Sequence, residues 1–212
     1  HLARRNMPFG ALFGEVARRP RLFLTVNAVL YGAFFFFACL APAVPVANMR
    51  LNGLVASEFQ DGSLSYVGEA YAGGEVLKAA GATFLHNFGV ATVLFTFLPS
   101  LLIPFAGAFK TALSFSLVGF AMAPIWTGMA SGFSFHCITM VLELEAYIVA
   151  SFAVILLPVY VLLGLSKGPF GAHLLSGLRL FGSAVITTAV MLAVAALYEA
   201  ATLILRSEER RV

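Results

Sequence analysis

Five long apolar stretches make up most of this chain of 212 residues. A transmembrane helix needs about 20 consecutive apolar residues, because the hydrocarbon core of a bilayer is about 30 Å thick. Charged residues are 11% of the sequence, against about 25% in a soluble domain. The sequence therefore predicts an all-α, polytopic integral membrane protein folded as one helical bundle. We expect its transmembrane helices at residues 22–46, 83–108, 112–133, 136–165 and 178–205.

Prolines interrupt three of these stretches. Pro99 and Pro104 lie in the second, Pro124 in the third and Pro158 near the end of the fourth. Proline removes a backbone hydrogen bond and bends a helix, so the freed carbonyl groups need partners within the protein. Bent helices can mark a transport site, but we favour static bends here. If the Pro99–Pro104 region is re-entrant, the number of transmembrane helices rises to six.

Charged residues gather outside the apolar stretches and divide the chain. We expect the bundle at 22–205 and a charged tail at 206–212. The connection at 47–82 mixes charged residues with glycine, so we expect it to face water and to contain one or two short interfacial helices, near 64–80.

The segment 1–21 is basic and has an apolar middle. It is expected to lie as a cytoplasmic amphipathic segment in the headgroup region of an anionic leaflet; a disordered basic tail is the alternative. The basic residues expected at the membrane surface are Arg4, Arg5, Arg18, Arg19 and Arg21.

The distribution of lysine and arginine predicts the orientation in the membrane. The N-terminal segment, the turn near Lys110 and the 166–179 loop carry most of these residues on one side of the bundle. Short loops rich in positive charge remain in the cytoplasm. We therefore expect a multi-pass cell-membrane protein with a cytoplasmic N-terminus and an extracytoplasmic C-terminus. In this arrangement the Lys110 amine extends to the cytoplasmic interface.

Several classes of function are disfavoured by the sequence. Cys39 and Cys137 lie in apolar stretches without CxxC spacing, so we expect two buried thiols rather than a disulfide or a metal site. No basic stretch interleaved with aromatics indicates nucleic-acid binding, and no glycine-rich nucleotide motif occurs. The sequence predicts no cofactor and no nucleic-acid partner.

Polar and ionisable residues occur near one end of three expected transmembrane helices, and such residues are costly in hydrocarbon and are functional candidates by default. At 1.5 Å per residue, those on the second, fourth and fifth helices fall within about 10 Å of the outer boundary. We call these residues the polar cluster: His86, Asn87, His136, Glu143, Glu145, Tyr198 and Glu199.

Helix geometry separates the acidic residues of the fourth helix. Glu143 and Glu145 point about 200° apart around the helix axis, so they cannot face the same partner. One is expected to face the bundle interior, and the other a neighbouring helix, the aqueous mouth or a second subunit. His136 lies two turns before Glu143 on the same face.

Three hypotheses suit this cluster. Its side chains can form a hydrogen-bonded network that holds helices together, which we favour. They can instead line a proton- or solute-coupled pathway. Lastly, His86, His136 and a glutamate can bind a catalytic metal, because two histidines and a carboxylate suit zinc, although no HExxH spacing is present.

The order of these residues resembles the stage II sporulation protein M family of bacterial and archaeal membrane proteins. The similarity covers nearly the whole chain and rests on the segments 85–91 (LHNFGVA), 142–146 (LELEA) and 196–200 (ALYEA). It assigns the family's polar positions to Asn87, Glu143 and Glu199.

The chain departs from the family pattern in three places. His86 stands where the family tends to have a second asparagine, and Lys110 and Thr111 stand where it tends to have Asn-Gly. Thr139 occupies a position, four residues before Glu143, at which the family often has histidine, and so no role carries over to His136.

The resemblance implies a membrane protein that acts in a cell-envelope complex; in sporulating members it implies a scaffold for peptidoglycan-remodelling hydrolases. We therefore expect a non-enzymatic scaffold that docks partners through the 47–82 connection and the polar cluster. The alternatives are a transporter or permease subunit with Glu143 and Glu199 in its pathway, and an intramembrane metal-dependent enzyme. Expected partners are the lipid bilayer, other membrane or envelope proteins, and further copies of this chain.

Overall fold

The computed structural model describes residues 9–127 and 133–209, with side chains at 9–123 and 137–205. The regular structure of these residues is helical, and five helices are long and apolar enough to cross a membrane. Both expectations, an all-α chain and five such helices, are confirmed for the described residues. The five candidate spans are Pro20–Ala43, Val76–Leu102, Ala106–Ala123, Cys137–Lys167 and Phe170–Leu205.

The helices follow one another with short connections. In chain order they are α1 (Gly10–Arg18), α2 (Pro20–Leu40), the 3-10 turn η2 (Ala41–Ala43), α3 (Pro45–Gln60), α4 (Ser65–Ala72), α5 (Val76–Phe84), the π-helix η3 (Leu85–Phe97), α6 (Leu98–Leu102), α7 (Ala106–Thr127), α8 (Phe133–Lys167) and α9 (Phe170–Glu209).

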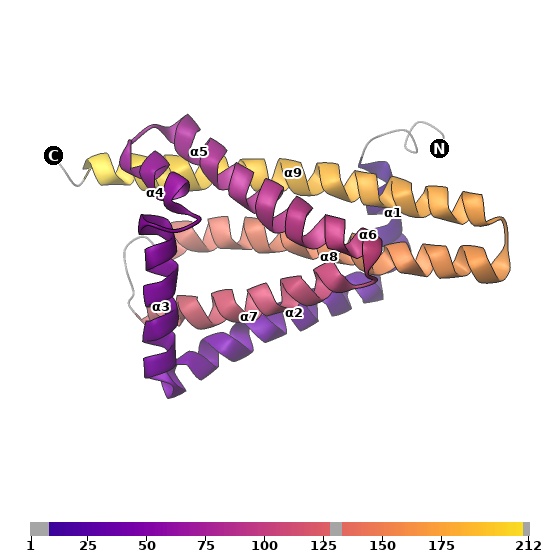
Figure 1. The fold of residues 1–212 in the computed structure, drawn as a ribbon, viewed down its shortest axis with the longest axis horizontal. Helices are drawn as coiled ribbons and strands as arrows, with labels where there is room; N and C mark the ends of the chain where they lie inside the picture. Colours follow the sequence, from indigo (N-terminus) through magenta and orange to yellow (C-terminus); the bar gives the residue numbers. More distant parts are fainter. Residues whose placement is uncertain (1–8, 128–132, 210–212) are drawn as a thin grey trace.

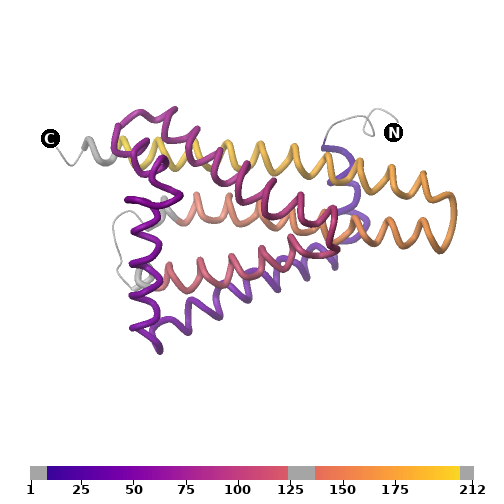
Figure 2. The backbone as a smooth tube through the Cα atoms, in the orientation of Figure 1, coloured from indigo at the N-terminus to yellow at the C-terminus, as the bar shows by residue number. Residues whose placement is uncertain are grey.

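The long helices run side by side along the longest axis of the molecule, and α3 lies across one end of them (Figure 1). Helix α8 packs chiefly against α9, and α2 packs against α7, while α5 and η3 together contact both α9 and α7. Helix α1 lies toward the opposite end from α3, and the turn between α8 and α9 extends beyond it (Figure 2). We call these two ends of the bundle the α3 end and the α1 end.

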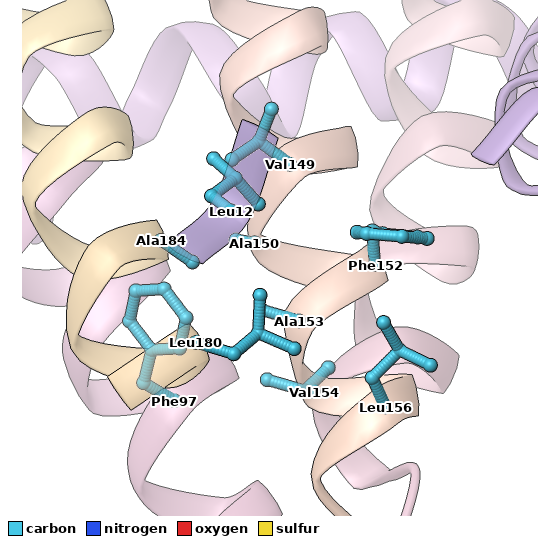
Figure 3. Packing of buried hydrophobic residues seen from close by; sticks show 10 residues of the cluster. All are labelled: Leu12, Phe97, Val149, Ala150, Phe152, Ala153, Val154, Leu156, Leu180 and Ala184. Atoms are coloured by element: carbon cyan, nitrogen blue, oxygen red, sulfur yellow. The ribbon is translucent and has the colours of Figure 1, made fainter. Parts of the chain in front are cut away.

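Most of the apolar core comes from α8. Its buried side chains, among them Phe152 and Leu156, meet Leu180 of α9 and Phe97 of η3 (Figure 3). Alanines on both α8 and α9 are fully buried, and small side chains of this kind let two membrane helices approach closely. Side chains on the outer surface, such as Phe36 of α2, are exposed, as expected where a helix faces lipid.

The described part of the basic N-terminal segment is a helix joined to this core. Leu12 of α1 is buried among the α8 and α9 side chains, and its N–H donates to the Ser183 hydroxyl at 3.2 Å. The buried Glu15 forms ion pairs with Arg18 (2.8 Å) and Arg19 (3.1 Å). Arg4 and Arg5 lie outside the described residues, and the role of the five arginines at a membrane surface remains a prediction.

The connection between the first two spans is shorter than expected. The second span begins at Val76, not at 83, because Ala79 and Ala80 pack against Ala200 of α9 and continue the helix. Lys78 is exposed beside them, and a lysine at the end of a membrane helix can extend its amine to water. Charge at this position therefore does not mark a loop.

The connection between the first two spans contains two helices, α3 and α4, at the α3 end of the bundle. Helix α4 falls within the region where we expected an interfacial helix, whereas the 16-residue α3 was not expected. Asn48 anchors α3, because its side-chain amide donates to the Phe120 carbonyl of α7 at 2.5 Å. The turn after α3 is held by Glu58, which accepts from the N–H and the hydroxyl of Ser63, and these hydrogen bonds lower the pKa of Glu58.

Two further expectations are corrected. Pro99 lies in the first turn of α6 and Pro104 in the turn before α7, so this region ends one span and begins the next, and the re-entrant, six-span alternative is wrong. Pro99 follows η3 without a break in the helix and lies near the end of the continuous span Val76–Leu102.

The expectation of two buried thiols is also wrong. Cys39 is exposed on the outer face of α2, and Cys137 is partly buried.

The close contact of α2 with α7 yields a prediction. A Cβ at Gly119 would collide with the Phe34 main-chain oxygen, whereas a Cβ at Gly32, on α2, would meet nothing within 4 Å. We expect Gly119→Ala to lower the free energy of unfolding by about 1–3 kcal/mol, the usual cost of overpacking. Denaturation of the purified protein in mixed micelles measures this change.

Gly32→Ala is the matched control, because alanine is the better helix former and has free space there. It should leave the unfolding free energy unchanged or slightly raised. Equal effects of the two substitutions would contradict the close α2–α7 contact.

Candidate functional site

The central contact of the polar cluster joins η3 to α8. The Asn87 side-chain amide donates to Glu143 Oε1 at 2.8 Å. Both side chains are half-buried, and they come from residues 56 positions apart in the chain. The structure therefore brings together two of the three residues singled out by the family resemblance.

Glu199 of α9 also lies near Glu143. The carboxylates of Glu143 and Glu199 are close enough for their charges to interact. Glu199 also interacts with the Tyr71 phenol of α4, whose oxygen lies 3.1 Å from the Thr83 hydroxyl of α5. The third residue of the resemblance is thus part of the same cluster, which reaches α4 in the connection between the first two spans.

Glu145 faces a different helix, as its position 200° from Glu143 predicts. It accepts a hydrogen bond from the Tyr31 phenol of α2 at 3.0 Å. The neighbouring-helix alternative is therefore the observed one. A second subunit is not needed to supply a partner for Glu145.

Lys110 lies inside the bundle rather than at its interface. Its amine donates to the Ala91 carbonyl of η3 at 3.0 Å and lies 6.0 Å from the centre of the Tyr147 ring on α8. The expected extension to the cytoplasmic interface is wrong, because α7 begins at Ala106 and turns Lys110, in its second turn, toward η3.

Asn87 lies deeper in its span than expected. Asn87 is 11 residues after Val76, the first residue of its span; at 1.5 Å per residue this is about 16 Å rather than one helical turn. Glu143 lies in the first half of α8 (Phe133–Lys167), and Glu199 lies in the second half of α9 (Phe170–Glu209). All three remain in the half of the bundle nearer the α3 end.

The remaining members of the polar cluster are placed less centrally. His86 is half-buried and lies close enough to Lys110 for their charges to interact. Tyr198 is half-buried and points about 100° away from Glu199 around α9. His136 belongs to α8, but its side chain lies outside the part that the structure describes.

Four residues of this site were not predicted from the sequence: Tyr31, Tyr71, Thr83 and Tyr147. Tyr147 carried a usable signal, because it lies one helical turn after Glu143 on the same face of the fourth span. Tyr31 and Tyr71 carried none, since only the three-dimensional packing of α2 on α8 and of α4 beside α9 brings them to Glu145 and Glu199.

The chemistry available to the site is that of hydrogen-bonded carboxyl, amide and phenol groups. Among the residues with described side chains, no group of three or more histidine, cysteine, aspartate or glutamate residues is placed to hold a metal ion. Scans of this sequence and structure against family models, curated proteins and solved structures return no match.

The surroundings of Tyr71 yield a prediction about alkaline pH. Burial, followed by the charge of Glu199, raises the pKa of Tyr71 above its usual value of about 10. The folded state therefore keeps a proton that the unfolded chain releases, and this stabilisation is present below pH 10 and is lost as the pH rises above it. We expect the unfolding free energy to fall more steeply above pH 10 in the unaltered protein than in Tyr71→Phe.

Tyr66→Phe is the matched control, since Tyr66 is on the same helix and exposed. Denaturation midpoints measured from pH 8 to 11.5 provide the comparison, over a range set by the usual tyrosine value. A Tyr71→Phe profile parallel to that of the unaltered protein would contradict the placement of Tyr71.

Proposed function

We propose that this chain is a non-enzymatic integral membrane scaffold, or a scaffold subunit of a cell-envelope complex, related in its role to the stage II sporulation protein M family. One observation supports this proposal above the others. The three described carboxylates of the polar cluster each engage a side chain on another helix: Asn87 with Glu143, Tyr31 with Glu145 and Tyr71 with Glu199.

The energetics of such contacts suit a structural role. A hydrogen bond between membrane helices contributes on average only about 0.6 kcal/mol. Its larger effect is geometric, because a polar side chain in an apolar bundle has few alternative partners. In this chain the contacts fix α2, α4 and η3 to the α8–α9 pair, so that the α3 end is held in one arrangement.

The α3 end offers the surface for partners. Helix α3 lies across the ends of the long helices (Figure 1) and exposes Met49, Arg50 and Leu54. In the proposed topology the N-terminus is cytoplasmic, and α3, α4 and the C-terminus are extracytoplasmic. This orientation follows the positive-inside rule and places the docking surface where envelope enzymes and their regulators act.

A transport role is the second candidate, and a separate observation favours it. Glu143 and Glu199 interact with each other at membrane depth, beside a π-helix, a geometry that recurs at functional sites. In this alternative the two carboxylates line a proton- or solute-coupled pathway. We do not propose a metal enzyme, because its ligand set would depend on His136.

The scaffold proposal is tested by site-specific photocrosslinking in the source cell. A photoreactive amino acid placed at Met49, Arg50 or Leu54 should give discrete crosslinked proteins, because these side chains point outward from α3. The same crosslinks should persist when the carboxylates are neutralised by Glu143→Gln and Glu199→Gln, since glutamine keeps the hydrogen-bonding shape. Photoreactive residues at Leu94 and Val190, which are exposed on the long helices, are the lipid-facing controls.

The transport alternative is tested on the same variants in reconstituted vesicles. A scaffold should give no proton flux above that of protein-free vesicles. A pH-driven flux that is lost in Glu143→Gln, together with an absence of discrete crosslinks from α3, would replace the scaffold proposal with the transport one.

A further inference from the structure

The π-helix η3 is unusually long. It extends over 13 residues, whereas π geometry is rare and occurs mostly as single turns inside α-helices. In a π-helix each N–H bonds to the carbonyl five residues back, rather than four. A stretch of this length therefore needs specific stabilisation from side chains.

Two threonines of η3 provide part of that stabilisation. Thr92 Oγ1 donates to the Asn87 carbonyl at 2.7 Å, and Thr96 Oγ1 donates to the Ala91 carbonyl at 2.9 Å. Both hydroxyls reach back five residues, which is the π spacing. Threonine in an α-helix bonds three or four residues back, as Thr111 does to Gly107.

Lys110 of α7 donates a further hydrogen bond to the Ala91 carbonyl, the one that Thr96 also bonds. Its amine bonds to Ala91 O at 3.0 Å, so that this oxygen accepts from two side chains. Placing an ammonium group inside an apolar bundle is costly, and a main-chain carbonyl that is also held by Thr96 offers it a fixed partner.

Asn87 lies one turn before this carbonyl, and its direction depends on the helix type. Each residue of a π-helix advances through a smaller angle than the 100° of an α-helix. Conversion of η3 to an α-helix would therefore rotate Asn87 about the axis relative to Ala91. The 2.8 Å hydrogen bond from Asn87 to Glu143 is made with η3 in the π form.

We propose that Lys110 is a positioning residue of the polar cluster: by bonding the Ala91 carbonyl it holds η3 in the π form and so directs Asn87 at Glu143. The inference concerns the geometry of the cluster and is independent of whether the chain is a scaffold or a transporter. Through this contact the second turn of α7 is linked to carboxylates nearer the α3 end.

Solid-state NMR of the protein in lipid bilayers tests the proposal. With ¹⁵N in asparagine side chains and ¹³C in glutamate carboxyl groups, through-space transfer reports an amide next to a carboxylate. Asn87 is the source of such a signal among the described residues, because Asn27, Asn48 and Asn52 donate to other oxygens. We expect Lys110→Met to weaken this signal, because losing an average interhelical hydrogen bond lowers the equilibrium constant for the Asn87–Glu143 contact by roughly threefold.

Lys78→Met is the matched control, since it removes an exposed lysine from the same span as η3 and should leave the signal unchanged. Thr96→Val provides a second variant that removes the other donor to Ala91 O, and it should weaken the signal in the same direction. If Lys110→Met does not fold, Thr96→Val carries the test. A folded variant that loses its donor and keeps the full Asn87–Glu143 signal would overturn the proposal.

Discussion

The constraint on which the rest of this structure depends is that polar groups away from water must find partners within the protein. Helix α8 meets this requirement in contacts with three other helices. It offers Glu143 to η3, Glu145 to α2 and the Ala146 carbonyl to the Thr188 hydroxyl of α9. Because α8 is also the main source of the apolar core, the same helix determines both the packing of the bundle and the arrangement of its polar cluster.

Much of the fold could be predicted from the sequence, because apolar length is a direct measure of what can cross a bilayer. Five spans were expected and five helices of suitable length and composition are found in the described residues. The boundaries were less accurate where charge was taken to mark a loop. Lys78 illustrates the reason: a lysine that extends to water is compatible with a helix that continues, and a single sequence does not distinguish that case from a connection.

The polar cluster was predictable in its carboxylates and much less so in their partners. Helical angles alone separate Glu143 from Glu145, and the structure places these residues on faces toward η3 and α2 respectively. The identity of the partners depends on which helices are neighbours, which no periodicity reveals. The predicted position of the Lys110 amine is the clearest error. Helix α7 begins six residues earlier than expected, so that Lys110 bonds inside the bundle and not at the interface.

The two ends of the bundle are connected through contacts that individually contribute little. Tyr71 interacts with Glu199, Glu199 with Glu143, and Asn87 with Glu143, while Lys110 holds the carbonyl one turn beyond Asn87. Each link joins different helices, so the displacement of one helix must break a contact with the next. Such a chain of contacts resists relative motion of α4, η3, α7, α8 and α9 more than the sum of small energies suggests, because a polar side chain inside an apolar bundle has few alternative partners. Rigidity of this origin is what a protein needs if it is to present α3 and α4 to partners in one orientation.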